Sequence, residues 1–321
     1  MSNYLGSTVI DSFGFNITPV ITTETEDAFL TGTLSEYSNG ELTQIYSYGL
    51  YSQSALTTFN APNIISIGDS AFAYCSKLTQ ASFPKCISIR THAFVSCIGL
   101  TQISFPECTY IGASAFAYCS KLTQVSFSKC TSITSNTFYS CLNLTSVYLP
   151  LAISSNFQGI FGGCNKLTDM VLNFSQISQL NGTFSYCYGL SQLLSFSQVT
   201  SIGNYTFYFC NKLTNISLPK LSSVGQYAFY GCYILPQISL PNCTYIGSSA
   251  FQRCSRLTSL NLNGISSVPN LANSNAFSST PIAGYSTYAE QLGSIYVPAS
   301  LYESFLTATN WSFYSDRIVS I

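Results

Sequence analysis

The chain has 321 residues, of which 46% are hydrophobic and 7% charged, and its net charge at pH 7 is −1. Ordinary soluble domains have about 25% charged residues, so the exposed positions of this chain must be mostly Ser, Thr, Asn, Gln and Tyr. No continuous apolar run reaches the roughly 18 residues that a membrane-spanning helix needs. The few basic residues are not accompanied by a recognised nucleic-acid-binding motif. We therefore expect neither membrane insertion nor nucleic-acid binding.

Residues 1–41 lack the repeat that follows them and are expected to form an N-terminal β cap or attachment segment. Residues 1–76 carry seven acidic side chains and no Lys or Arg, whereas residues 77–289 carry ten basic and two acidic side chains. The pair Asn39-Gly40 predicts a β-hairpin turn. Residues 1–6 contain no Lys or Arg before an apolar run, so no secretory signal peptide is expected.

Residues 42–280 repeat with a period of 22 or 23. The spacing of Phe72, Cys75 and Leu78 returns throughout this region. The leucine column has ten members: Leu56, Leu78, Leu100, Leu122, Leu144, Leu167, Leu190, Leu213, Leu235 and Leu257. A fixed period of this length predicts a solenoid of about ten stacked coils. Between residues 150 and 200, Gly159, Gly162 and Gly163 interrupt the pattern, and a bend or loop is expected there.

Each coil is expected to contain a strand, a turn, and then a second short strand or a 3₁₀ turn. Alternating apolar residues such as Ala81 and Phe83 indicate a strand with every second side chain turned inward. Proline cannot donate to a strand ladder, so the first strand should end at Pro84, Pro106, Pro150, Pro219 and Pro241. The second strand is expected at Ser88-Ile89, Tyr110-Ile111, Ser201-Ile202 and Tyr245-Ile246.

Nine of the thirteen cysteines share one column of the repeat and four share another. In the second column, other coils carry Ile64, Val199 or Leu221, which marks a core position where Cys acts as a small hydrophobe. We therefore expect reduced, buried thiols. A disulfide framework and a metal site are the alternatives. The odd count argues against the first, and the absence of Cys-x2-Cys spacing argues against the second.

The sequence predicts no catalytic site, no metal site and no cofactor. His92 is the only histidine, is expected at the surface, and has no Ser and Asp at a spacing that suggests a triad. The acidic residues Asp69, Glu107 and Asp169 are too scattered in the repeat to form a carboxylate pair.

Binding is instead predicted on the exposed polar positions. Repeated Thr, Gln and Ser on the first strand can form hydrogen-bonded ladders, or can bind a glycan or an extended polypeptide. Tyrosines between the Phe and Cys columns offer amphipathic contact area that suits protein or sugar binding. A column of lysines beginning at Lys77 serves solubility or attracts an anionic ligand. The candidate binding residues are Gln80, Gln102, Gln124, Tyr118, Tyr148 and Asn215.

Residues 281–321 are expected to form a C-terminal cap. Ser300 and Glu303 have the spacing of a capping box, and Leu301, Phe305 and Leu306 recur at helical spacing. We expect a helix over about residues 300–309 and expect Trp311 to pack against the last coil.

The repeat resembles a known family. Residues 111–127 read I-G-A-S-A-F-A-Y-C-S-K-L-T-Q-V-S-F, which is similar to the BspA-like leucine-rich repeat, also called the Treponema pallidum type, with the consensus I-G-x-x-A-F-x-x-C-x-x-L-T-x-I-x-L-P. The resemblance covers about residues 42–280 and implies a mainly β leucine-rich-repeat solenoid, surface display, adhesion and no catalytic residues. Some members of the family are encoded in phage or prophage tail regions.

Taken with the polar strand positions, the resemblance implies a non-enzymatic protein that binds a protein or glycan on a cell surface. It would act as an adhesin or as a phage receptor-binding protein, located at a cell surface or on a virion. The alternative is a cytoplasmic scaffold for protein–protein interaction, which fits reduced cysteines directly.

Overall fold

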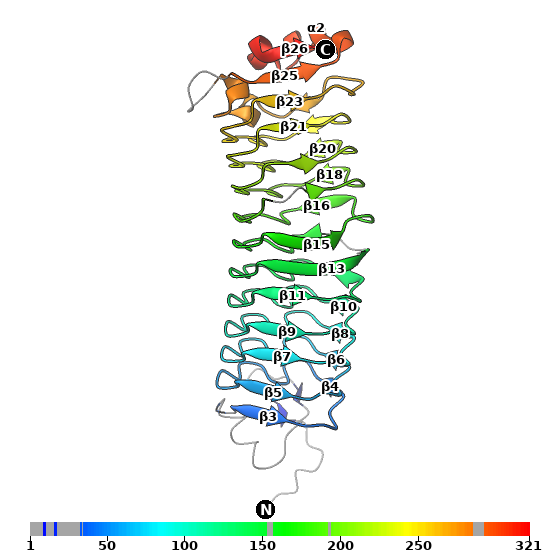
Figure 1. Cartoon of the computed structure of the whole chain (residues 1–321), viewed down its shortest axis with the longest axis vertical. Helices are drawn as coiled ribbons and strands as arrows, with labels where there is room; N and C mark the ends of the chain where they lie inside the picture. The colour runs from blue at the N-terminus through cyan, green and yellow to red at the C-terminus, as the bar shows by residue number, and fades with distance from the viewer. Residues whose placement is uncertain are drawn as a thin grey trace, which may run out of the picture. The chain divides into compact units, whose positions relative to one another are not determined.

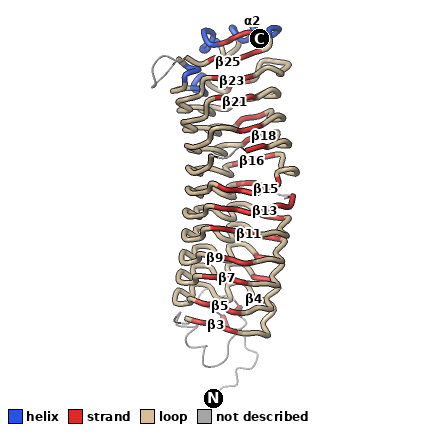
Figure 2. The backbone as a smooth tube through the Cα atoms, in the orientation of Figure 1, coloured by secondary structure: helices blue, strands red, loops and turns tan. Residues whose placement is uncertain are grey.

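The structure, a computed structural model, describes residues 9–10, 16–17, 33, 35–152, 157–191, 194–284 and 292–321. Figure 1 labels its strands and the helix α2. The chain divides into two compact units. Unit 1 comprises Met1–Leu151 and Met170–Leu172, and unit 2 comprises Ala152–Asp169 and Asn173–Ile321. Within each unit the backbone winds into coils made of short strands and turns (Figure 2). The mainly β, parallel-coil fold predicted from the period is therefore confirmed.

The coils of unit 1 contribute strands to two faces. On the first, which we call the strand face, the strands are β3 (Glu36–Ser38), β5 (Thr58–Asn60), β7 (Gln80–Ser82), β9 (Gln102–Ser104), β11 (Gln124–Ser126), β13 (Ser146–Ala152) and β15 (Asp169–Asn173). On the second, the parallel sheet β12-β10-β8-β6-β4 contains β4 (Gln44–Ile45), β6 (Ser66–Ile67), β8 (Ser88–Ile89), β10 (Tyr110–Ile111) and β12 (Ser132–Ile133). The second short strand thus lies where the sequence predicted it.

Unit 2 repeats this arrangement. Its six-stranded parallel sheet contains β14 (Phe157–Gln158), β16 (Gln179–Asn181), β18 (Ser201–Ile202), β20 (Ser223–Val224), β22 (Tyr245–Ile246) and β24 (Asn270–Leu271). Its other strands are β17 (Leu194–Ser195), β19 (Ile216–Ser217), β21 (Gln237–Ser239), β23 (Ser259–Asn261), β25 (Ser294–Val297) and β26 (Ile318–Ser320). Parallel pairing continues past the predicted coils, because β25 pairs with β23 and β26 pairs with β25.

Stacked phenylalanines form the core of each unit. In unit 1, the Phe94 ring lies nearly parallel to those of Phe72 and Phe116, with centroids 4.9 and 5.2 Å away. In unit 2, Phe229 and Phe277 flank Phe251 in the same way, at 5.1 and 5.3 Å. Identical residues meet because each coil places the same repeat position directly above the last.

The thirteen cysteines are all free and buried, as the column pattern predicted. Eight thiols of the first column donate to a backbone carbonyl of the previous coil. The Cys97 Sγ donates to the Phe72 oxygen at 3.0 Å and the Cys119 Sγ to the Phe94 oxygen at 3.2 Å. Burial raises the pKa of the Cys75 and Cys119 thiols from 9.0 to about 12. These two thiols therefore stay protonated at neutral pH.

Thiol reactivity should report this burial. At pH 8 we expect a thiol reagent to label few cysteines in the native protein and nearly all thirteen after unfolding, with the intact mass unchanged by reductant. Because the folded-state pKa of the Cys75 and Cys119 thiols lies above their unfolded-state pKa, their contribution to stability is complete below about pH 9 and is lost as the pH rises toward 12. Fast labelling of most thiols in the native state would contradict the burial.

Two positions in each regular coil have a left-handed backbone. One lies two residues before the column Phe and the other lies just before the column Cys, as at Ser114 (φ 53°) and Tyr118 (φ 62°). Gly159 (φ 62°) and Gly163 (φ 76°) occupy the same two positions. The prediction that these glycines interrupt the repeat is therefore wrong; they meet its backbone requirement without the steric cost that other residues carry. Residues 153–156, within the region of the predicted bend or loop, lie outside the described residues.

β13 also departs from its prediction, because it continues past Pro150 to Ala152. The fixed φ of proline is compatible with an extended strand, and only one ladder donor is lost.

At the N-terminal end, β1 (Val9–Ile10) pairs antiparallel with β2 (Asn16–Ile17), while the rest of residues 1–32 lies outside the described residues. The hairpin predicted at Asn39-Gly40 is wrong, because β3 pairs in parallel with β5 from the next coil. Asn39 instead closes a local turn, with its Oδ1 accepting from the Glu41 backbone N–H at 2.8 Å. The coil that contains β3 and the coils at the C-terminal end were not in the predicted set. They bring the total to about 12 turns, against the ten predicted.

The C-terminal cap has the predicted helix in a shorter form. The 3₁₀ helices are η1 (Ser274–Phe277), η2 (Pro281–Ala283), η3 (Ala299–Leu301) and η4 (Ser312–Arg317), and the α-helix is α2 (Tyr302–Thr307). The predicted capping box is wrong, because the chain enters the helix through η3 and the N-cap of α2 is Leu301, whose side chain cannot cap. Trp311 is buried, as predicted, and its Nε1 donates to the Pro269 oxygen at 2.7 Å.

Candidate functional site

A depression of about 470 Å³ lies on the strand face of unit 1, across β9, β11 and β13. Its lining contains no charged side chain and consists of Thr101, Gln102, Ile103, Thr123, Gln124, Val125, Ser126, Ser146 and Tyr148. The polar members come from the exposed positions that flank the inward residue of each strand. The sequence therefore places amides, hydroxyls and one phenol around a floor of two aliphatic side chains.

Strand register aligns these side chains. Gln80 of β7 is opposite Gln102 of β9, and Ser126 of β11 is opposite Tyr148 of β13. Alternate residues of a strand point to opposite faces, and Gln80, Gln102 and Gln124 are all exposed. Within the described part of the chain, no hydrogen bond engages these three amide groups. They are therefore available to a ligand.

The depression coincides with a break in the strand ladder. β9 and β11 are neighbours, but they belong to separate hydrogen-bonded sheets, β7-β9 and β11-β13-β15. At this step Ile103 is half-buried, whereas Ala81 and Val147 at the equivalent positions are buried. Beside this break, Ile103 adds a half-buried aliphatic side chain to the polar groups of the depression.

Threonine side chains show the same break. Thr101 Oγ1 donates to the Thr79 carbonyl at 3.0 Å and Thr145 Oγ1 to the Thr123 carbonyl at 3.0 Å. Among the described residues, Thr123 makes no equivalent bond to Thr101. Of the Thr, Gln and Ser side chains predicted to form a ladder, threonine forms it, by donating to backbone carbonyl groups. The series is interrupted between Thr101 and Thr123.

The structure separates the six predicted binding residues. Gln102, Gln124 and Tyr148 line the depression, and Gln80 is the next glutamine along the strand face. Tyr118 is exposed on a turn outside the strand face, where its ring meets that of Tyr139 at 5.6 Å. Asn215 belongs to unit 2 and is exposed just before β19. Ile103 and Val125 were not predicted, because their columns indicate core positions.

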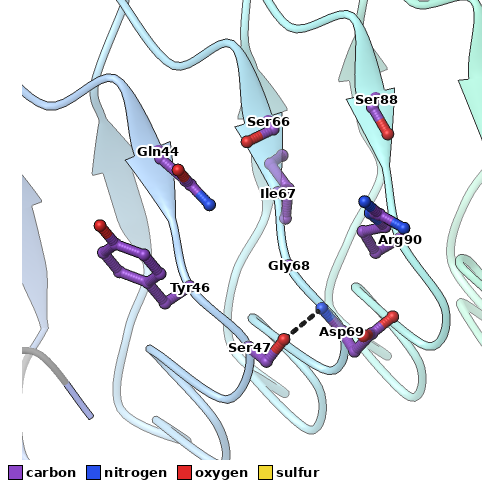
Figure 3. Close-up of a pocket in the computed structure, with 9 residues that line it drawn as sticks. All are labelled: Gln44, Tyr46, Ser47, Ser66, Ile67, Gly68, Asp69, Ser88 and Arg90. Carbon is purple, nitrogen blue, oxygen red and sulfur yellow. Dashed lines mark hydrogen bonds between the residues drawn. The ribbon is translucent and has the colours of Figure 1, made fainter.

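A second hollow of about 380 Å³ lies on the other face of unit 1, beside β4, β6 and β8 (Figure 3). It includes Asp69 and Arg90 from successive coils. Gly68 forms part of the hollow, and a Cβ there would lie 2.4 Å from the Ser47 nitrogen, so glycine permits the close approach of the coils. The Asp69 backbone N–H donates to Ser47 Oγ at 3.1 Å. The Asp69 side-chain Oδ1 accepts from the Thr91 backbone N–H at 3.0 Å. The carboxylate is thus already used to join two coils.

The described residues contain no group of three or more His, Cys, Asp or Glu placed to hold a metal ion. His92 is exposed. No helix in the described ranges is long and apolar enough to cross a membrane.

Parallel coils with stacked Leu, Phe and Cys columns define a leucine-rich-repeat protein. The family model described as the BspA type leucine-rich repeat region matches residues 43–168, 87–193 and 176–299. The chain therefore belongs to the BspA-type leucine-rich-repeat family, as the resemblance implied. No curated protein sequence matches the chain.

Two solved structures with TM-scores above 0.5 have the same fold. A leucine-rich repeat protein from Bacteroides ovatus is 20% identical, with a TM-score of 0.57 over 89% of this chain and 66% of its own, slightly less than two thirds. The pneumococcal vaccine antigen PcpA is 17% identical, with a TM-score of 0.51 over 89% of this chain and 77% of its own. A Treponema pallidum leucine-rich repeat protein is 29% identical over 47% of this chain and 72% of its own, with a TM-score of 0.42.

Proposed function

We propose that this protein is a non-enzymatic, adhesin-like binding protein that recognises a protein or glycan on a cell surface through the strand face of unit 1. The observation that carries the proposal is the depression between β9 and β11, where the free amides of Gln102 and Gln124 border Ile103 and Val125. Membership of the BspA-type family supports both the binding role and a location at the surface of a cell. A phage receptor-binding role would use the same surface.

The chemistry of the depression favours an uncharged part of the target. Each glutamine amide offers both a donor and an acceptor, which matches the hydroxyl groups of a sugar or the backbone of an extended peptide. One hydrogen bond contributes only about 0.5–1.5 kcal/mol net, so useful affinity needs several coils at once. The aliphatic floor adds a hydrophobic contact to these bonds.

A cytoplasmic scaffold for protein–protein interaction is the second candidate. The thirteen free cysteines favour it, because a reducing compartment keeps thiols in this state. Both candidates place the contact on the strand face, so the identity of the captured partner separates them.

The combined change Gln80→Glu, Gln102→Glu and Gln124→Glu is expected to abolish binding and leave the fold intact. It places three like charges along one face and removes three amide donors without altering the core. Binding of the purified protein to whole bacterial cells and to host matrix proteins identifies the target, and biolayer interferometry then compares the variants.

The matched control is Gln158→Glu, Gln179→Glu and Gln237→Glu, which makes the same charge change at exposed positions of unit 2. The control should bind like the unchanged protein. Full affinity in the first triple variant would contradict a site on the strand face of unit 1. Capture of cytoplasmic proteins alone would favour the scaffold.

A further inference from the structure

Unit 2 carries a dense group of aromatic side chains outside its core. We call it the tyrosine surface; it consists of Tyr186, Tyr188, Tyr205, Tyr208, Phe209, Tyr227, Tyr230 and Tyr233. Tyr186 and Tyr205 are each 42% exposed, and Tyr188 is 38% exposed. The other members are half-buried. Three successive coils therefore present one continuous, accessible aromatic surface.

The rings stack from one coil to the next. Tyr205 and Tyr227 lie 5.2 Å apart at 18°, and Tyr208 and Tyr230 lie 5.1 Å apart at 21°. In each stacked pair, the faces that the two rings turn toward each other are covered. The surface therefore offers ring edges and hydroxyl groups to solvent. Aromatic edges carry partial positive charge, and phenol hydroxyls can donate hydrogen bonds.

Packing holds the surface in place before any ligand arrives. Phe209 contacts Tyr208, Tyr230 and Tyr233, with ring centroids 4.7, 5.4 and 6.1 Å away. A Cβ on Gly231 would lie 2.8 Å from the Phe209 ring, so the glycine leaves room for that ring to lie across the next coil. Little side-chain entropy then remains to be lost on binding.

The local charge is positive. The Arg253 guanidinium lies 5.6 Å from the centroid of the Tyr230 ring, and residues 170–289 contain four Lys or Arg and no Asp or Glu. Burial, followed by the neighbouring Tyr186, raises the pKa of Tyr208. The Tyr208 hydroxyl therefore remains protonated at neutral pH, and the Arg253 guanidinium makes the surface complementary to an anion.

Backbone groups beneath the surface are already used. The N–H groups of Tyr186, Phe209 and Gly231 donate to the carbonyl oxygens of Tyr208, Tyr230 and Gln252 at 2.7, 2.8 and 2.9 Å. An extended peptide could not add to this backbone as a further strand. Recognition must come from hydroxyl groups, ring edges and the guanidinium, which suit the hydroxyls and acidic groups of a sugar chain.

We propose that the tyrosine surface of unit 2 binds an acidic polysaccharide that carries carboxylate or sulfate groups. The tyrosine columns repeat at 5.1–5.2 Å, about the length of one pyranose residue in an extended chain, so successive sugars meet successive coils. Arg253 pairs with an acidic group at one end of the row. This site is independent of the strand face of unit 1 and takes a ligand of different charge.

Biolayer interferometry with the full chain tests the proposal. The probes are polygalacturonate for carboxylate, dextran sulfate for sulfate, neutral dextran, and poly-L-glutamate as an acidic polypeptide. We expect binding to one or both acidic polysaccharides, weakening as salt rises, and much weaker binding to the other two probes. Absence of binding to both acidic polysaccharides, or equal binding to dextran or poly-L-glutamate, would overturn the proposal.

Two variants locate the site. The double change Tyr186→Asn and Tyr205→Asn should lower affinity about tenfold or more; asparagine tolerates the left-handed backbone at both positions. Arg253→Gln should independently lower the affinity for the acidic polysaccharide about tenfold and reduce the salt dependence of that affinity. The matched controls, Tyr74→Asn with Tyr139→Asn and Lys77→Gln, alter exposed side chains of unit 1 and should bind normally. Equal losses in variants and controls would also overturn the proposal.

Discussion

Replacing Phe94 with alanine is expected to lower the free energy of unfolding of the protein by about 3–5 kcal/mol. Phe94 is fully buried, and its ring is stacked between those of Phe72 and Phe116. The cavity cannot close easily, because backbone bonds hold the coils on both sides. The Phe94 N–H donates to the Ala115 oxygen and the Phe72 N–H to the Ala93 oxygen, both at 2.7 Å.

Denaturant unfolding followed by circular dichroism measures the change. Phe313→Ala is the matched control, because that ring is 68% exposed, and its loss should cost less than about 1 kcal/mol. Each coil contacts only its neighbours, so hydrogen exchange should show the destabilisation first in the coils next to Phe94. Similar small losses in both variants would argue against the stacked core.

Trp311→Ala is expected to have a comparable effect, centred on the C-terminal cap. Trp311 is 1% exposed, and its ring lies 5.1 Å from Phe305 and 6.1 Å from Phe277. The change removes this packing, at about 3–5 kcal/mol, and leaves the Pro269 carbonyl without its donor. The Trp311 ring covers apolar side chains of the neighbouring coil and of α2, so its loss should expose them.

Trp311→Phe helps to separate the two contributions, because it keeps one aromatic ring in the packed site while it removes the indole N–H donor and leaves a smaller cavity than alanine does. We expect it to cost about 1–3 kcal/mol. Hydrogen exchange of β25 and β26 and the denaturant midpoint follow both variants. Unchanged protection of these strands in Trp311→Ala would show that α2 and η4 close the end of unit 2 without the tryptophan.

The two proposed binding surfaces share one physical principle. A repeat brings the same side-chain type to every coil, so weak contacts add along the column. On the strand face the repeated group is the neutral glutamine amide of Gln80, Gln102 and Gln124, and on unit 2 it is the tyrosine ring. A ligand is therefore selected by the spacing of its own repeating groups as much as by any single contact.

The sequence alone determined the coil, the second short strand, the Phe and Cys columns and the family. This was possible because every position of a repeat has nearly the same environment in each coil, so a column that accepts Cys, Ile, Val and Leu reveals its burial. Signals read from a few neighbouring residues were less reliable. Asn39-Gly40 and Ser300 have favourable local patterns, but pairing between coils and entry through η3 overrode them.

Only the tertiary structure decided where the surface opens. Gln102, Gln124 and Tyr148 could be predicted as exposed, but the depression between β9 and β11 and the half-buried Ile103 within it depend on how neighbouring coils pack. The tyrosine surface also required the structure, since the approach of Phe209 to Gly231 follows from left-handed backbone just before the Cys column. Residue types mark which positions face outward; the backbone geometry between neighbouring coils decides which of those side chains meet.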